Sequence, residues 1–146
     1  MQTVEQAKQE LRANWEVGIN CPCCGQFVKK YSYSLNAGLA VVLIKMFKSN
    51  GNGWVHVNKT IRPASGGYFS LAKWWDLIEQ QSNDDPEKRG SGLWRLTQKG
   101  HNFVRNLILV PKYVEVFDNK FLAFSGENIS IKEALSNKFN YEELMK

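Results

Sequence analysis

The sequence has little that would mark a membrane protein or a secreted one. Its longest apolar stretch, residues 37–47, is interrupted by Lys45 and is far shorter than the roughly 20 residues that cross a bilayer. Charged side chains run through residues 1–20, which leaves no room for the apolar segment of a secretory signal. We therefore expect a cytoplasmic protein with no membrane partner.

Cysteine and histidine are scarce, and the motifs of common enzymes are absent. The three cysteines lie together at Cys21, Cys23 and Cys24, and an odd, clustered set of this kind is not a disulfide framework. The cluster therefore indicates a reducing compartment. The chain contains no G-x-S-x-G, P-loop, H-E-x-x-H or dinucleotide-binding motif, and its two histidines are far apart in the sequence. We predict no catalytic residue and expect the protein not to be an enzyme.

Apolar side chains and positive charge, by contrast, are well supplied. Hydrophobic residues make up 43% of the chain, which is enough to bury the core of one ordinary domain with small extensions. Lysine and arginine outnumber aspartate and glutamate by 19 to 14, for a formal net charge of +5. This balance favours a polyanionic partner, although a basic protein without such a partner has the same composition.

Local patterns predict a mixed α+β fold. Helices are predicted at residues 3–15, 35–47, 58–61, 71–77, 97–105, 131–135 and 141–145. Short apolar runs between turn residues predict strands at residues 54–57, 77–81, 93–96, 113–117 and 121–125. Ser34, Ser70 and Thr97 are the predicted N-caps of the helices that follow them.

From residue 34 onward, the predicted order is helix, short strand, short helix, helix, strand, polar loop, strand and helix. This is the order of a winged helix-turn-helix, in which one helix enters the major groove and a hairpin lies beside it. We therefore predict three parts. Residues 1–33 form a helix and a cysteine knuckle, residues 34–106 form a winged-helix domain, and residues 107–146 form a C-terminal β-hairpin with short helices packed on that domain.

The predicted hairpin resembles the wing of MarR-type transcription regulators. The resemblance rests on Leu-Ile-Glu at residues 77–79, Asp-Asp-Pro-Glu-Lys-Arg at residues 84–89, and Leu-Trp-Arg-Leu-Thr-Gln-Lys-Gly at residues 93–100. That family has a Leu-Ile-Glu-like strand after its recognition helix, then an acidic and arginine-containing loop, then a strand that ends in Leu-Thr-x-Lys-Gly. The resemblance implies a winged helix. It does not extend to the long terminal helices through which MarR-type regulators dimerise.

The chain as a whole is similar to small phage-encoded proteins that join a Cys-Pro-x-Cys-Gly-Gln segment, here residues 21–26, to a winged helix. We therefore expect a phage or prokaryotic regulator that binds double-stranded DNA in the cytoplasm of a bacterial host cell. The alternative is a phage-encoded protein-interaction module that inhibits a host enzyme or a defence complex.

Residues on the predicted recognition helix, on the wing and beside the preceding short helix are expected to contact DNA phosphates. They are Lys59, Arg62, Ser70, Lys73, Lys88, Arg89 and Arg95. Ser70 would act through the backbone N–H groups of a helix N-terminus, and the cations through their charge. Each cation is equally consistent with a solvated surface residue. The acidic pair at residues 84–85 either positions the two cations of the wing tip or weakens DNA binding.

Trp74 and Trp75 are neighbours, so their side chains point about 100° apart on a helix. One of them belongs to the core. The other is the candidate contact residue for a protein partner, unless both are buried between the helix and the wing.

Cys21 and Cys24 form a C-x-x-C pair, which is half of a zinc-ribbon signature. A closed zinc site needs four ligands, and the sequence has no second pair of this kind. One hypothesis is a zinc site made of Cys21, Cys24, His56 and one more ligand. The alternatives are a degenerate knuckle without metal, or thiols that act as small apolar side chains. A redox role is disfavoured because the thioredoxin-like βαβ context is missing.

Overall fold

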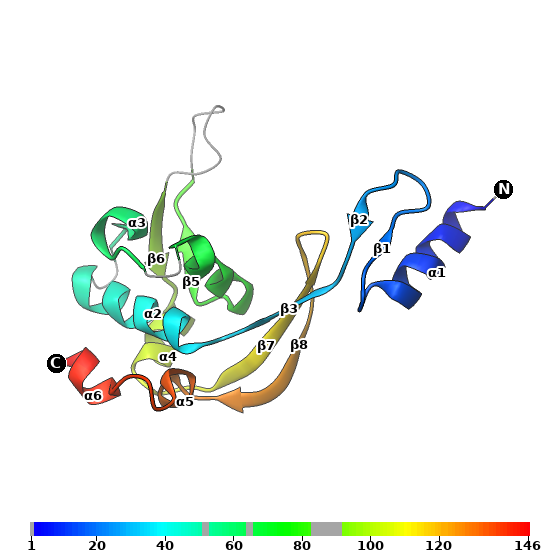
Figure 1. The fold of residues 1–146 in the computed structure, drawn as a ribbon. Coiled ribbons are helices and arrows are strands. Elements are labelled where there is room, and N and C mark those ends of the chain that lie inside the picture. Colours follow the sequence, from blue (N-terminus) through cyan, green and yellow to red (C-terminus); the bar gives the residue numbers. More distant parts are fainter. Residues whose placement is uncertain (1, 51–52, 64–65, 83–91) are drawn as a thin grey trace.

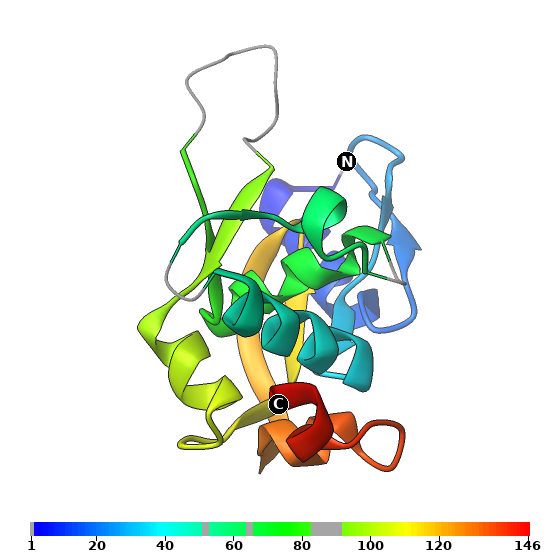
Figure 2. The same cartoon turned by 90° about the vertical axis from the view of Figure 1, so that its left-hand side faces the viewer.

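The apolar stretch near the middle of the chain forms α2 (Ala37–Asn50), the helix around which the core is built. The computed structural model describes residues 2–50, 53–63, 66–82 and 92–146, and α2 lies among the other helices and the small sheet, at the centre of the view in Figure 2. Leu39, Leu43 and Ile44 are almost fully buried. Because α2 is covered on several sides, its sequence is apolar around most of its circumference rather than along one narrow stripe.

A small antiparallel sheet packs beside α2. It contains β4 (Val55–His56), β5 (Ile78–Gln80) and β6 (Leu93–Leu96), with β6 in the centre. Two helical segments connect β4 to β5, namely α3 (Val57–Thr60) and the 3₁₀ segment η1 (Gly66–Trp75). Residues 78 and 96 face each other across the β5–β6 pair, so the hairpin that the sequence predicts is present at its base.

The helix after β6 begins where the sequence predicts. Thr97 is the N-cap of α4 (Gln98–Val104), and its hydroxyl accepts the Gly100 N–H at 3.0 Å. The same hydroxyl donates to the Asp76 carbonyl at 2.6 Å, which ties the start of α4 to the end of η1. The cap therefore fixes the helix and the sheet in one arrangement.

A second antiparallel sheet pairs one strand from the N-terminal part of the chain with two strands from the C-terminal part. Its strands are β3 (Tyr31–Ser34), β7 (Val110–Phe117) and β8 (Lys120–Ile129), in that order. Asp118 and Asn119 both adopt positive φ in the turn between β7 and β8, as a two-residue hairpin requires. The predicted C-terminal hairpin is thus confirmed, and it is longer than the sequence suggests.

The chain then ends in two short helices, α5 (Ile131–Leu135) and α6 (Tyr141–Met145), at the predicted positions. Ile131 and Leu135 belong to the same core as α2, and the Tyr141 hydroxyl donates to the Val104 carbonyl at 2.5 Å. Among the residues that the structure describes, no helix combines the length and the apolar character needed to cross a membrane.

Residues 2–30, which we call the N-terminal arm, extend away from the later helices α2 to α6 (Figure 1). The arm contains α1 (Val4–Asn14) and a two-stranded sheet of β1 (Ile19–Asn20) and β2 (Phe27–Val28). It meets the tip of the β7–β8 hairpin, where the rings of Trp15 and Phe117 lie 5.0 Å apart. Lys30 forms an ion pair with Glu115 of β7 at 3.3 Å, and a second ion pair with Glu16 within the arm.

Two predicted helix caps are wrong. Ser34 is the last residue of β3, and the Asn36 side chain instead accepts the Leu39 N–H at the start of α2, at 3.0 Å. Ser70 lies inside η1, which begins at Gly66. Each serine belongs to another element instead of preceding the expected helix: Ser34 to β3, and Ser70 to η1, which starts four residues earlier. The α+β class is confirmed.

Candidate functional site

The predicted DNA-contact residues that the structure describes lie on the elements around the small sheet. In both views, α3 and η1 lie on the same side of α2, near the base of the β5–β6 hairpin (Figures 1 and 2). Lys59 and Arg62 are exposed on α3 and just after it, and Lys73 is exposed near the end of η1. Among the described residues, no carboxylate forms an ion pair with any of these three cations.

The local contacts of the three cations leave their charges available. Lys73 lies 5.2 Å from the centre of the Trp74 ring, in a cation–π arrangement that keeps its ammonium group in solvent. The Arg62 Nε donates to the Lys59 carbonyl at 3.4 Å, and Arg62 itself adopts a φ of 54°. These contacts orient the Lys73 and Arg62 side chains without neutralising them.

Arg95 differs from these three cations because its charge is already compensated. Its Nε donates to a Glu79 carboxylate oxygen at 2.5 Å across the β5–β6 pair, and its guanidinium lies 4.3 Å from the centre of the Trp54 ring. The residue lies on the predicted wing strand, as expected. Its engagement with Glu79 makes it a weaker candidate for phosphate contact than Lys59 or Lys73.

The predicted wing-tip residues Lys88 and Arg89 lie outside the residues that the structure describes, as does the acidic pair at residues 84–85. Their role therefore stays a prediction.

The helix-terminus role that the sequence suggests for Ser70 is wrong. Because Ser70 is half-buried inside η1, its N–H does not belong to the first turn of a helix.

The prediction that one tryptophan belongs to the core is confirmed. Trp75 is 0% exposed, and its indole N–H donates to the Pro111 carbonyl at 2.7 Å. Trp75 is therefore not a partner-contact residue, whereas Trp74 is half-buried.

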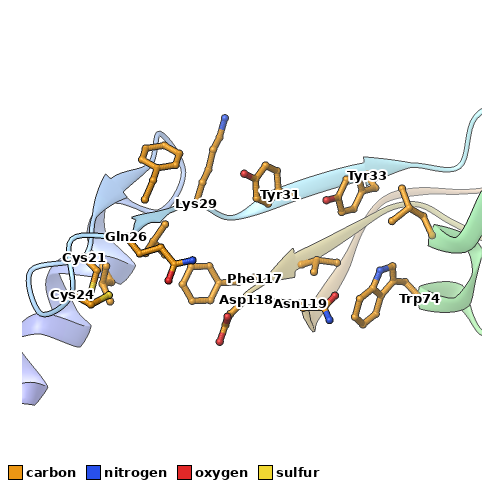
Figure 3. A pocket seen from close by; sticks show the side chains of 15 residues that line it. Cys21, Cys24, Gln26, Lys29, Tyr31, Tyr33, Trp74, Phe117, Asp118 and Asn119 are labelled. Atoms are coloured by element: carbon orange, nitrogen blue, oxygen red, sulfur yellow. The ribbon is translucent and has the colours of Figure 1, made fainter. Parts of the chain in front are cut away.

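Trp74 lines a feature that the sequence did not reveal, an open groove of about 540 Å³. Figure 3 shows the groove along β3, with η1 at one end and the cysteine turn at the other. Its walls come from four separate parts of the chain, namely the arm, β3, η1, and the end of β7 with the turn that follows it. We call it the aromatic groove. Its ring-bearing residues are Phe27, Tyr31, Tyr33, Trp74 and Phe117.

The aromatic groove has the chemistry to hold a planar group. The rings of Tyr31 and Tyr33 are 6.1 Å apart and within 10° of parallel, and Lys29 lies 6.0 Å from the centre of the Tyr31 ring. Asp118 and Asn119 supply polar atoms at the edge. Stacked rings beside a cation suit a base or an aromatic side chain. The one sequence signal is the alternation Tyr-Ser-Tyr-Ser, which places both rings on one face of a strand.

The cysteines form a tight turn between β1 and β2, at the end of the groove. The Cys23 N–H points at the Cys21 sulfur at 3.4 Å. The turn is closed by a hydrogen bond that the Gly25 N–H donates to the Cys21 carbonyl at 2.8 Å. Hydrogen bonds from the backbone of Cys24 and then of Cys23 lower the pKa of the Cys21 thiol below its ordinary 9.0. All three cysteines are free thiols.

The structure does not bring His56 to Cys21 and Cys24. The His56 Nδ1 accepts the Lys59 N–H at 3.3 Å as the N-cap of α3, and a Cβ placed on Gly92 would lie 2.7 Å from its Nε2. The imidazole is thus engaged on the small sheet, while the cysteine turn lies in the arm (Figure 1). Within the described part of the chain, no three His, Cys, Asp or Glu side chains are close enough to hold a metal ion.

Comparisons of the chain with protein-family models, with curated proteins and with solved structures found no match.

Proposed function

We propose that the protein is a non-enzymatic regulator that binds double-stranded DNA through a winged helix in residues 34–106. One observation carries the proposal. The small sheet has the strand order β4–β6–β5, and α3 and η1 lie between β4 and β5 in the sequence. The antiparallel pair of β5 and β6 follows directly after η1. In a winged helix the segment at the position of η1 enters the major groove, and the hairpin contacts the backbone or the minor groove beside it.

The charges around η1 support the same proposal. Lys59, Arg62 and Lys73 are exposed and are not neutralised by a described carboxylate, so each can replace a counterion at a DNA phosphate. In this proposal Lys88 and Arg89 extend the contact from the tip of the wing. These contacts set affinity and position rather than sequence preference.

The test is fluorescence anisotropy of a labelled duplex of random sequence, titrated with protein at several salt concentrations. We expect the logarithm of affinity to fall linearly with the logarithm of salt, with a slope of about −0.9 for each phosphate contact. Lys73→Ala and Lys59→Ala should each weaken binding and reduce the slope by about one contact.

Lys8→Ala is the matched control, because Lys8 is an exposed lysine on α1, in the arm and away from α3 and η1 (Figure 1). This control should bind like the unchanged protein. A slope near zero, or equal losses for all three variants, would refute the proposed interface. Preferential binding of single strands that is lost in Tyr31→Ala would instead point to the aromatic groove.

The setting of the proposed regulator follows from the two resemblances, to MarR-type wings and to phage proteins with a Cys-Pro-x-Cys-Gly-Gln segment. We propose that it acts on transcription in the cytoplasm of a bacterial host. A genome-wide search for bound fragments, followed by footprinting, would test this step separately from DNA binding itself.

A second candidate function is protein interaction, by a phage-encoded inhibitor of a host enzyme or defence complex. It is favoured by an apolar strip on the edge strand β8, where Phe121, Leu122 and Phe124 are each more than a third exposed. The Phe121 and Phe124 rings lie 4.9 Å apart and form one contact surface. Trp74 contributes a second surface in the aromatic groove.

For this candidate, the protein is used as bait in bacterial lysate, and the retained partner is identified and purified. Phe121→Ser combined with Phe124→Ser should abolish binding of that purified partner. Phe139→Ser, which also changes an exposed phenylalanine, should leave the binding intact. Equal binding by both variants would exclude the β8 strip as the contact.

A further inference from the structure

The turn that carries Cys21 and Cys24 has the form of one half of a metal site. Cys21 N–H donates to the Gln26 carbonyl at 2.7 Å, and Gly25 N–H donates to the Cys21 carbonyl at 2.8 Å, so two backbone hydrogen bonds close the turn. Gly25 has a φ of 79° and open space around the position of a Cβ. Glycine is therefore required here by the backbone conformation and not by crowding.

We propose that Cys21 and Cys24 bind zinc together with the same two cysteines of a second copy of this chain. A structural zinc ion takes four ligands, and this turn supplies two. The proposal goes beyond DNA binding and does not depend on it.

The hydrogen bonding at Cys21 supports a thiolate ligand. The Cys23 N–H points at the Cys21 sulfur at 3.4 Å, so the backbone offers a donor to the charge that a ligating sulfur carries. In a C-x-x-C turn the first and fourth side chains are the ligands. Cys23 occupies an inner position, is exposed, and serves as an internal control.

The remaining two ligands are not found in the described part of the same chain. No third His, Cys, Asp or Glu lies close enough to the turn to complete a site there, and His56 caps α3 on the small sheet. A second cysteine turn supplies the two missing thiols with the chemistry that zinc prefers.

The position of the turn permits such a pairing. It is the loop between β1 and β2 in the arm, on the side of the molecule away from α2 (Figure 1). Cys24 is exposed and Cys21 is partly exposed, so two turns can approach to the short distances that zinc–sulfur bonds require. The four thiols release their protons as zinc binds, and no oxidation occurs.

The test uses the full-length protein, reduced and freed of metal, then titrated with zinc. Molar mass is followed by light scattering during size-exclusion chromatography, and bound zinc by elemental analysis. We expect the molar mass to double as zinc is added, with one zinc ion bound per two chains. A chelator should return the protein to the monomer. Cobalt should give the absorption spectrum of a tetrahedral four-thiolate site only in the dimer.

Cys24→Ser and Cys21→Ser should each bind no stoichiometric zinc and stay monomeric, with far-UV circular dichroism showing that the fold is kept. Cys23→Ser should behave like the unchanged protein. Four outcomes would overturn the proposal: one zinc ion per monomer, no zinc binding, a dimer that is indifferent to zinc, and zinc binding that survives in Cys24→Ser. All of these readouts are independent of DNA, so a failure here is distinct from a failure of the proposed function.

Discussion

From Leu35 to Leu135 the chain supplies almost all of the buried apolar side chains, whereas the N-terminal arm buries only Ala7 among the described residues. The first region is held together by packing over many neighbouring side chains. The arm is joined to this region by the Trp15–Phe117 ring contact and the ion pair between Lys30 and Glu115. The other ion pair of Lys30, to Glu16, and its backbone hydrogen bond to the Trp15 carbonyl lie within the arm. Loss of packing should therefore unfold the first region as a unit, while the arm should detach without unfolding the rest.

The largest contrast should come from removing one aromatic ring from each region. Phe103 is 0% exposed, so Phe103→Ala should lower the free energy of unfolding by about 3–5 kcal/mol. Phe27 in the arm is 57% exposed, and Phe27→Ala should change that free energy by less than about 0.5 kcal/mol. Urea denaturation followed by tryptophan fluorescence measures both. Equal losses would mean that arm and core unfold together.

Adding a methyl group inside the first region tests how closely its core is packed. A Cβ on Gly100 would lie 2.1 Å from the Leu77 carbonyl oxygen, which is held in place because it accepts the Thr97 N–H. Gly100→Ala should therefore cost about 1–3 kcal/mol although it lies in a helix. Gly38 in α2 is the control, because the nearest atom to its Cβ would be 3.4 Å away. Gly38→Ala should stabilise the protein by up to about 1 kcal/mol.

Acid should weaken the core through His101, whose ring packs against Phe47. Desolvation, aided by the positive charge of Arg105, lowers the pKa of His101 below its ordinary 6.5. As the pH falls below 6.5, the unfolded chain takes up a proton that the folded chain resists, so stability is lost by no more than about 1.4 kcal/mol per pH unit. The measurement is the free energy of unfolding at pH 7.5 and pH 5.5. His101→Phe should lose less between these two values, and an unchanged loss would contradict the assignment.

The elements that the sequence predicts well are those whose signals are local. Thr97 caps α4 because its own side chain reaches the third N–H of that helix, and β6 runs over residues 93–96 because its four residues alternate between the core and the outside. The short helices at 131–135 and 141–145 begin after Ser130 and Asn140, whose side chains accept backbone N–H groups. Each of these signals lies within a few residues of the structure that it specifies.

What the sequence could not show depends on residues far apart in the chain. β3 forms because Tyr33 pairs with Val114, about 80 residues later, and four residues of Tyr-Ser alternation do not identify that partner. The aromatic groove was missed for the same reason, since it exists only once β3 lies between the arm and η1. The expected link between His56 and the cysteines assumed that the turn folds against β4. Instead, the pairing of β3 with β7 carries the turn away from β4, toward the tip of the β7–β8 hairpin.

The smallest expected change in global stability comes from Lys30, which nevertheless should decide whether the arm docks. Lys30→Met removes the ion pairs to Glu16 and Glu115 and leaves an apolar side chain of similar length. We expect faster hydrogen exchange and proteolysis within residues 2–30, with a change of less than about 0.5 kcal/mol in global unfolding. Lys29→Met is the control, because Lys29 is exposed and contacts Tyr31 instead of a carboxylate.

The pH dependence of protection within the arm gives Lys30 a second signature. Its hydrogen bond to Glu16 outweighs desolvation and raises the pKa of Lys30 above its ordinary 10.5. A raised lysine pKa contributes stability that is fully present below pH 10.5 and is lost as the pH rises through the higher folded value. Protection of the arm should therefore hold from neutral pH to about pH 10 and then fall, and Lys30→Met should show no such fall. If the arm of Lys30→Met stays as protected as that of the unchanged protein, the Trp15–Phe117 contact is sufficient for docking, and the two regions are more tightly joined than their burial suggests.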